Sequence, residues 1–116
     1  MRKMIIGIAS QQDIRARALA IARGDHQPRP GEPKIWFTSM RSLAEVLSDD
    51  NRALLRVIQE HKPESLSRLA ELTGRAPSNL SRTLKTMEHY GLVEMRRDVR
   101  TVRPVAKASV FVIQAA

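Results

Sequence analysis

The sequence predicts a mainly α-helical protein with one small β-hairpin near its C-terminal end. Between residues 39 and 90, apolar residues recur at helical spacing in segments that open with Ser or Pro. After Gly91 the pattern changes to two short strand-like runs around a charged turn. Aromatic residues make up only 3% of the 116 residues, so the core is expected to consist of Leu, Ile, Val, Ala and Met. This length suits one domain with a short appendage.

The first part of the chain, residues 1–34, is predicted to be an N-terminal arm. Ser10 and Asp13 resemble a capping box, and the helix that follows ends before Gly24. Because its apolar side is largely alanine, this helix needs a surface to lie on. Three prolines and a glycine in residues 25–34 then predict an extended linker. The sequence thus divides into an arm over 1–34 and a compact domain over 35–116.

Three helices are predicted next, each opened by a serine. Ser39 precedes a short helix, and Ser48 precedes a second helix that ends at Pro63. Two aspartates follow Ser48, where negative charge complements the helix dipole. Ser65 opens the third helix, and Gly74 closes it.

A fourth helix follows after the tripeptide Gly-Arg-Ala, with proline in its first turn and Gly91 as its stop. Two helices joined by such a short turn outline a helix-turn-helix. Leu80, Leu84 and Met87 fall on one apolar stripe of the helix that follows this turn. The polar side chains fall elsewhere: Ser78, Arg82, Lys85 and His89 on the opposite side, with Asn79, Ser81 and Thr86 flanking them.

The composition of this polar side indicates contact with double-stranded DNA. Small side chains such as Ser and Asn allow a helix to approach base edges closely, and Arg and Lys reach bases or phosphates. An ordinary solvent-exposed helix normally mixes Glu with Lys, whereas residues 75–87 contain no acidic residue. The sequence therefore favours a DNA-reading helix over a merely solvated one.

The distribution of charge supports the same interpretation. The net charge is +8, with +4 in residues 1–34, −1 in residues 35–74 and +5 in residues 75–116. A basic surface attracts polyanions and speeds encounter with them. The hairpin that follows the helix over residues 77–90 is predicted to carry Arg96, Arg97 and Arg100 near its tip. There they can contact phosphates or the minor groove.

The run LSRLAELTGRAPSNLSRTLKTMEHYGLVEM resembles the winged helix-turn-helix of MarR-like and ArsR-like transcriptional regulators. Over residues 33–105 the chain is similar to a family of short predicted prokaryotic regulators. The resemblance implies a sequence-specific regulator that places a recognition helix, residues 77–90, in the major groove and a basic wing, residues 92–105, on the backbone or minor groove. The long dimerisation helices of larger MarR-like proteins are missing, which argues against a small-molecule inducer. The candidate DNA-binding residues are Arg75, Ser78, Asn79, Ser81, Arg82, Lys85, Thr86, Arg96, Arg97 and Arg100.

The resemblance also leads us to expect a homodimer, because helix-turn-helix regulators usually match two half-sites. The N-terminal helix, the Ile-Trp-Phe run and the VFVI run are candidate dimer surfaces. The arm either crosses to the partner subunit or folds back on its own domain. A second function remains open: an antitoxin or complex subunit that binds a toxin-like protein and uses DNA binding for autoregulation. RNA binding is less favoured, because the basic surface lacks stacking aromatic residues.

Other functions find little support in the sequence. The chain contains no cysteine, which excludes disulfides and thiolate chemistry, and its three histidines are scattered without partners. We therefore expect no enzyme activity, no metal and no cofactor. No apolar run approaches the roughly 20 residues that a membrane span requires. A cytoplasmic protein without a signal peptide is expected.

Overall fold

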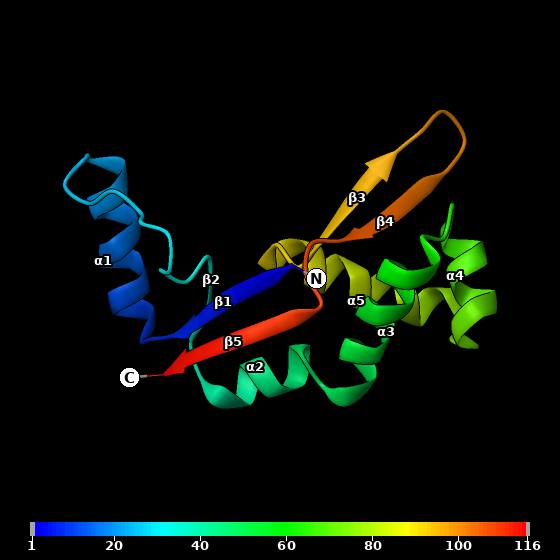
Figure 1. The fold of residues 1–116 in the computed structure, drawn as a ribbon, viewed down its shortest axis with the longest axis horizontal. Coiled ribbons are helices and arrows are strands. Elements are labelled where there is room, and N and C mark those ends of the chain that lie inside the picture. The colour runs from blue at the N-terminus through cyan, green and yellow to red at the C-terminus, as the bar shows by residue number, and fades with distance from the viewer. Residues whose placement is uncertain (1, 116) are drawn as a thin grey trace.

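The computed structural model of the chain describes residues 2–115 and has a mixed α/β fold (Figure 1). Within this range, five helices accompany a three-stranded sheet and a two-stranded hairpin. The elements in order are β1 (Lys3–Ile8), α1 (Gln11–Ala22), β2 (Ile35–Phe37), α2 (Met40–Val46), α3 (Asp49–His61), α4 (Leu66–Thr73), α5 (Pro77–Tyr90), β3 (Val93–Arg97), β4 (Val102–Ala106) and β5 (Val110–Ala115).

The three-stranded sheet corrects the expectation of a mainly α-helical fold. Its strand order is β2-β1-β5, and both pairs are parallel. Ile6 of the central strand lies opposite Ile35 on one side and Ile113 on the other. Parallel neighbours require crossover connections, so α1 with its linker joins β1 to β2. The other four helices and the hairpin all lie between β2 and β5 in the sequence.

Strand β1 was not predicted from the sequence, and it lies inside the segment assigned to the arm. The run of apolar residues in MIIGI lacks the alternation that marks a half-buried strand, and such short runs are ambiguous between helix and strand. Ile6 is fully buried, whereas none of the residues of α1 is buried. The predicted boundary at residue 34 falls between two strands of one sheet. The division into an arm and a domain stays a prediction.

The predicted helix starts are confirmed by hydrogen bonds. Each of the four serines accepts a bond at Oγ from the backbone N–H three residues later, over 3.0–3.2 Å: Ser10, Ser39, Ser48 and Ser65. These bonds satisfy N–H groups that have no partner within the helix. Gly74 and Gly91 end α4 and α5 with φ of 71° and 84°, a left-handed conformation that favours glycine.

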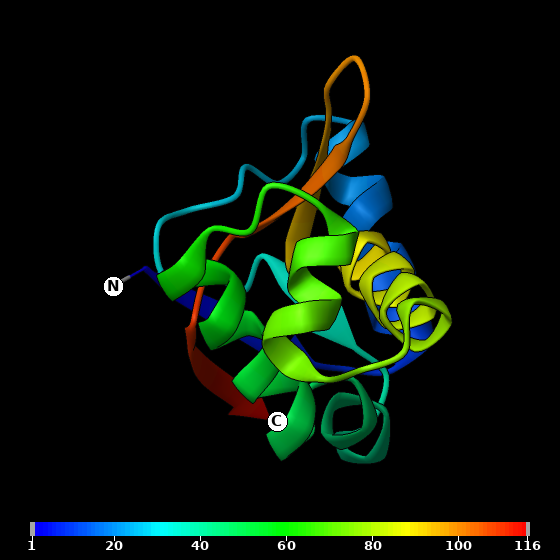
Figure 2. The ribbon, with the colours of Figure 1, turned by 90° about the vertical axis from the view of Figure 1, so that its right-hand side faces the viewer.

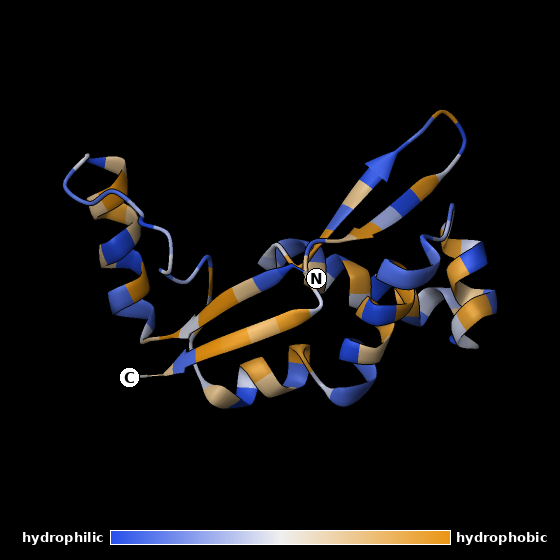
Figure 3. Ribbon diagram, in the orientation of Figure 1, coloured by the Kyte–Doolittle hydropathy of each residue, from blue (hydrophilic) through white to orange (hydrophobic). Residues whose placement is uncertain are grey.

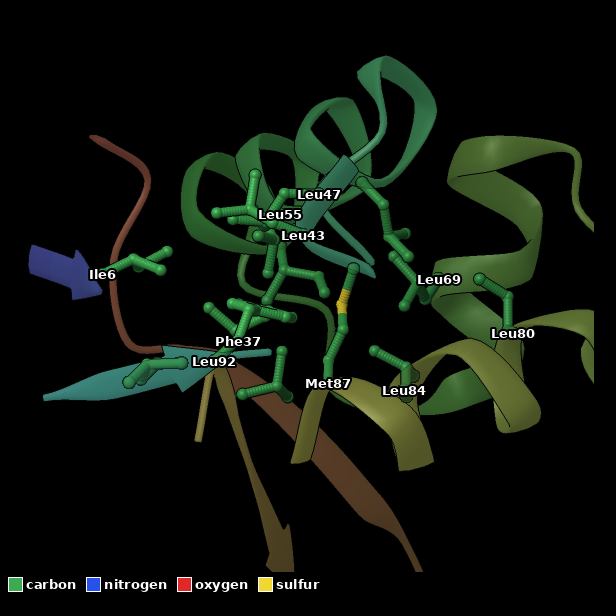
Figure 4. Close-up of a cluster of buried hydrophobic side chains, with 14 residues drawn as sticks. Ile6, Phe37, Leu43, Leu47, Leu55, Leu69, Leu80, Leu84, Met87 and Leu92 are labelled. Atoms are coloured by element: carbon green, nitrogen blue, oxygen red, sulfur yellow. The ribbon is translucent and has the colours of Figure 1, made fainter. Parts of the chain in front are cut away.

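One contiguous apolar core joins the sheet to the helices (Figure 4). Leu80, Leu84 and Met87 of α5 are each at most 1% exposed and point into this core. Phe37 of β2 stacks on Tyr90 at the end of α5, with ring centroids 4.4 Å apart. The position of α5 is therefore set by both α4 and the sheet.

A polar cluster holds α1 close to its linker. Arg17 of α1 donates to the Glu32 carboxylate over 2.7 Å, and its guanidinium lies 5.3 Å from the centre of the Trp36 ring. His26 lies 3.0 Å from the same carboxylate. The hydrogen bond from Arg17, followed by the contact with His26, lowers the pKa of Glu32 from 4.5 to about 2. These contacts of α1 with its own chain are thus local to residues 11–36.

Replacement of Arg17 by Ala is expected to raise the pKa of Glu32 toward 4.5, because the main donor to the carboxylate is lost. Since the folded-state pKa is depressed, the contact stabilises the fold above pH 4.5, and this contribution is lost as the pH falls through about 2. NMR titration of the Glu32 carboxyl carbon measures the shift. An unchanged midpoint in the variant would show that the contact does not form.

Replacement of Gly7 by Ala is predicted to destabilise the fold, because the Trp36 ring covers Gly7. A Cβ at this position would lie 2.4 Å from a ring carbon of Trp36 and 2.9 Å from Pro33 Cγ. Gly7→Ala should therefore cost about 1–3 kcal/mol of unfolding free energy, as overpacking does. In a Trp36→Phe background, which has a smaller ring, the cost should fall. Thermal unfolding followed by circular dichroism provides the comparison, and equal costs in both backgrounds would contradict the contact.

Candidate nucleic-acid interface

The turn between α4 and α5 is tied to α3 by one arginine. Gly74 reverses the chain, and the backbone N–H of Arg75 donates to Thr73 Oγ1 over 3.3 Å. The Arg75 guanidinium donates to Asn51 Oδ1 over 3.3 and 3.4 Å. Arg75 is only partly exposed. It fixes the angle at which α5 leaves the turn, and its guanidinium already has a partner.

The start of α5 leaves backbone N–H groups without a side-chain cap. Pro77 occupies the first helical position, and Ala76 before it supplies no capping oxygen. The first N–H groups of a helix have no partner within it and carry a partial positive charge, so they are suited to bind an anion such as phosphate. Residues 75–87 add no acidic side chain.

The structure brings the predicted polar side chains of α5 to the surface. All six are exposed, and the apolar stripe lies behind them: Ser78, Asn79, Ser81, Arg82, Lys85 and Thr86. The hydroxyl of Thr86 donates to the carbonyl oxygen of Arg82 over 3.2 Å, so it offers only acceptor lone pairs outward. Because the exposed set follows the buried stripe, the orientation of α5 agrees with the one that its sequence predicts.

The hairpin formed by β3 and β4 projects from the domain as a wing. Figure 2 shows it rising above the helices, with α5 along the flank beside it. Arg96 lies directly opposite Arg103 across the two strands, which brings two like charges together. Arg96 also makes a 3.4 Å contact with Glu94. Arg97 and Arg100 are exposed, so all three predicted wing arginines face solvent.

Two residues near the predicted contacts, one in α3 and one in α5, were not predicted from the sequence. A groove of about 640 Å³ runs between α3, α4 and α5, and Asn51 and Thr83 line it together with Arg75 and Asn79. Asp50 lies in the same groove and opposes an anion there. No local signal predicts the role of Asn51, because its partner is 24 residues away in the sequence.

A second set of residues that the sequence did not reveal lies at the base of the wing. Lys62, Arg96 and Arg103 line a cavity of about 300 Å³ together with apolar residues of α3 and β4. Lys62 ends α3 with a φ of 46°, the only positive φ at a non-glycine residue in the range 2–115. Lys62 and Arg103 are both exposed, so they lengthen the basic surface of the hairpin toward α3.

Residues 2–115 contain neither a metal-binding cluster of side chains nor a membrane-spanning helix. Within residues 2–115, no three side chains of the His, Cys, Asp and Glu types gather in a metal-binding group. None of the helices in that range has the length and apolar character needed to cross a bilayer.

The chain belongs to the HVO_A0114 family, whose model matches residues 46–113. This match spans α3, α4, α5, the hairpin and most of β5. The crystal structure of a predicted DNA-binding transcriptional regulator from E. coli is similar to this chain with a TM-score of 0.50 and 19% identity, and the alignment covers 85% of each chain. This similarity concerns the fold and is consistent with a winged-helix-like arrangement. Comparison with curated proteins gives no match.

The buried and exposed sides of α5 are expected to respond differently to truncation. Leu84→Ala should lower the unfolding free energy by about 2–5 kcal/mol, because it opens a cavity in the core. Arg82→Ala should change it by less than about 0.5 kcal/mol, because Arg82 is exposed. Urea denaturation of both variants tests the orientation of the helix. A large loss for Arg82→Ala would contradict it.

Proposed function

We propose that the protein is a sequence-specific, double-stranded DNA-binding transcriptional regulator. The observation that carries the proposal is the exposed, acid-free leading half of α5, whose leucines are buried behind it. Such a helix can enter a major groove with its small side chains close to the bases. The similarity in fold to a predicted DNA-binding transcriptional regulator from E. coli supports the same function.

The side chains divide into those that read bases and those that bind phosphates. Asn79 and Arg82 have the groups that pair with adenine and guanine edges, and Ser78 permits close approach. Ser81, Lys85 and Thr86 flank this reading edge. The wing arginines bind phosphates or the minor groove. Their contacts with phosphates release counterions from the DNA, and this release favours binding. Arg75 positions the turn through Asn51 and binds a phosphate only if it leaves this partner.

The finer assignments extend this proposal. The MarR-like or ArsR-like character follows from the sequence resemblance. A homodimer follows from the two half-sites that such regulators usually bind. A cytoplasmic location and the absence of catalysis, metal and cofactor complete the proposal. An antitoxin role with a toxin-like protein partner stays a prediction, and an adjacent toxin-like reading frame would favour it.

Arg82→Ala is expected to cost about 1–3 kcal/mol of binding to a preferred duplex if its guanidinium reads a base. The preferred duplex is first selected from a random pool, and affinity is measured by fluorescence anisotropy. Discrimination against a substituted base pair should fall in the variant at one position of the site. Equal losses on preferred and scrambled duplexes would reject base reading by Arg82.

The double substitution Arg96→Ala, Arg97→Ala should instead weaken binding to all duplexes alike. The double substitution removes two phosphate contacts. A plot of the logarithm of the DNA association constant against the logarithm of the salt concentration should therefore have a slope shallower by about 2. Arg56→Ala, which removes an exposed charge from α3, is the control and should leave the slope unchanged. A double variant with the wild-type slope would show that the hairpin does not touch DNA.

A further inference from the structure

The strand β5 leaves one long edge of the sheet open. It pairs with β1 on one side, and within residues 2–115 its other side pairs with no strand. An unpaired edge presents free N–H and C=O groups, and proteins usually protect it with charges, proline or short length. β5 has six residues, VFVIQA, without charge or proline. At the opposite edge of the sheet, β2 has only three residues.

Both faces of β5 are also incompletely covered. Register with β1 places Ile113 beside the buried Ile6 and Val112 beside Ile5, so the two residues lie on opposite faces. Ile113 is 44% exposed and Val112 is 39% exposed. Figure 3 shows apolar residues along most of this strand at the rim of the sheet. A neighbouring strand with its own side chains would reduce the exposure of both faces.

The charge distribution favours a second copy of this chain as the neighbour. With a net charge of +8, two copies repel each other overall. Residues 108–116 contain no charged side chain, so the side chains of β5 add nothing to this repulsion. A strand edge is also self-complementary about a two-fold axis, because antiparallel copies exchange the same hydrogen bonds.

We propose that the protein dimerises by antiparallel pairing of β5 with β5 of a second copy, which forms one continuous six-stranded sheet. The inference deepens the proposed function and rests on it in one respect, since it names the contact that relates two recognition helices by a two-fold axis. In this arrangement the strand order across the dimer is β2-β1-β5 followed by β5-β1-β2 of the second copy. Each recognition helix remains outside the interface, because the DNA-facing start of α5 lies at the other end of the domain (Figure 1).

The two-fold axis makes a sharp geometric requirement. In a continuous sheet the two-fold axis is perpendicular to the plane of the sheet and passes between the two β5 strands. One residue of β5 must therefore lie directly opposite the same residue of the second copy. Residues directly opposite in antiparallel strands have Cβ atoms about 4.5–5.5 Å apart, which a disulfide or a short linker can bridge. The chain has no cysteine of its own, so single cysteines report this position without background.

The test places a single cysteine at each of positions 110–115 in the full chain and follows cross-linking by a short bifunctional thiol reagent. We expect rapid cross-linking at one position, slower reaction at its neighbours, and background reaction for the control Val99→Cys. Val99 lies at the wing tip and is 95% exposed. If no strand position cross-links faster than Val99→Cys, the inference is wrong.

Light scattering provides the second measurement. The wild-type chain should have a mass in solution of twice 13.1 kDa, the mass of one copy. The Val112→Lys variant should have the mass of one copy. Val99→Lys adds the same charge to the wing tip and should remain a dimer. Circular dichroism checks that each variant is folded. A wild-type monomer, or a folded Val112→Lys variant that stays dimeric, overturns the inference.

The outcome is separable from that of the proposed function. A monomer that still selects particular duplexes overturns the β5 contact and leaves DNA recognition intact. A dimer cross-linked through β5 that shows no duplex preference supports the contact and overturns DNA recognition. Attachment of some other protein to β5 in place of a second copy would appear as a wild-type monomer and would also overturn the inference.

Discussion

The burial of one apolar stripe determines how α5 presents itself. Leu80, Leu84 and Met87 pack into the common core, so the polar residues between them must face solvent. Burying three such side chains contributes several kcal/mol, about 1.5–3 kcal/mol each, far more than a surface contact could offset. The stack of Phe37 on Tyr90 and the Arg75–Asn51 hydrogen bonds then fix the two ends of the helix. The outward face is thus a consequence of the inward one.

The structural elements that depend on local signals can be predicted from the sequence. Serine caps, the proline at the start of α5 and the two closing glycines act within a few residues, so their positions can be read directly. The exposure of Arg82 and Lys85 follows from helical periodicity alone. The hairpin is predictable because charged turn residues separate two short strand-like runs.

The elements that depend on distant partners cannot be predicted in this way. β1 is a strand because residues more than a hundred positions later form its neighbour β5. The role of Asn51 likewise requires Arg75, and the cover of Gly7 requires Trp36. A single sequence carries no local record of such pairings. For this reason the sequence predicts an arm at the N-terminal end, although Ile6 lies in the core.

The three-stranded sheet brings together strands from the two ends of the chain. β1 lies between β2 and β5, so the first and last strands of the described chain are neighbours in one sheet, and this sheet lies on the side of the domain away from the α4–α5 turn (Figure 1). The basic helix start and the hairpin are left free at the other side. In the proposed dimer, this separation would place the β5 contact away from the helix start that we propose to bind DNA.

The most direct test of DNA recognition by α5 is an NMR map of backbone amide shifts on addition of a selected duplex. We predict that the largest changes fall in residues 78–86, with a second group in residues 96–100, and that α1 and β5 change little. Changes confined to the sheet or to α1, with α5 unaffected, would contradict DNA recognition by this helix.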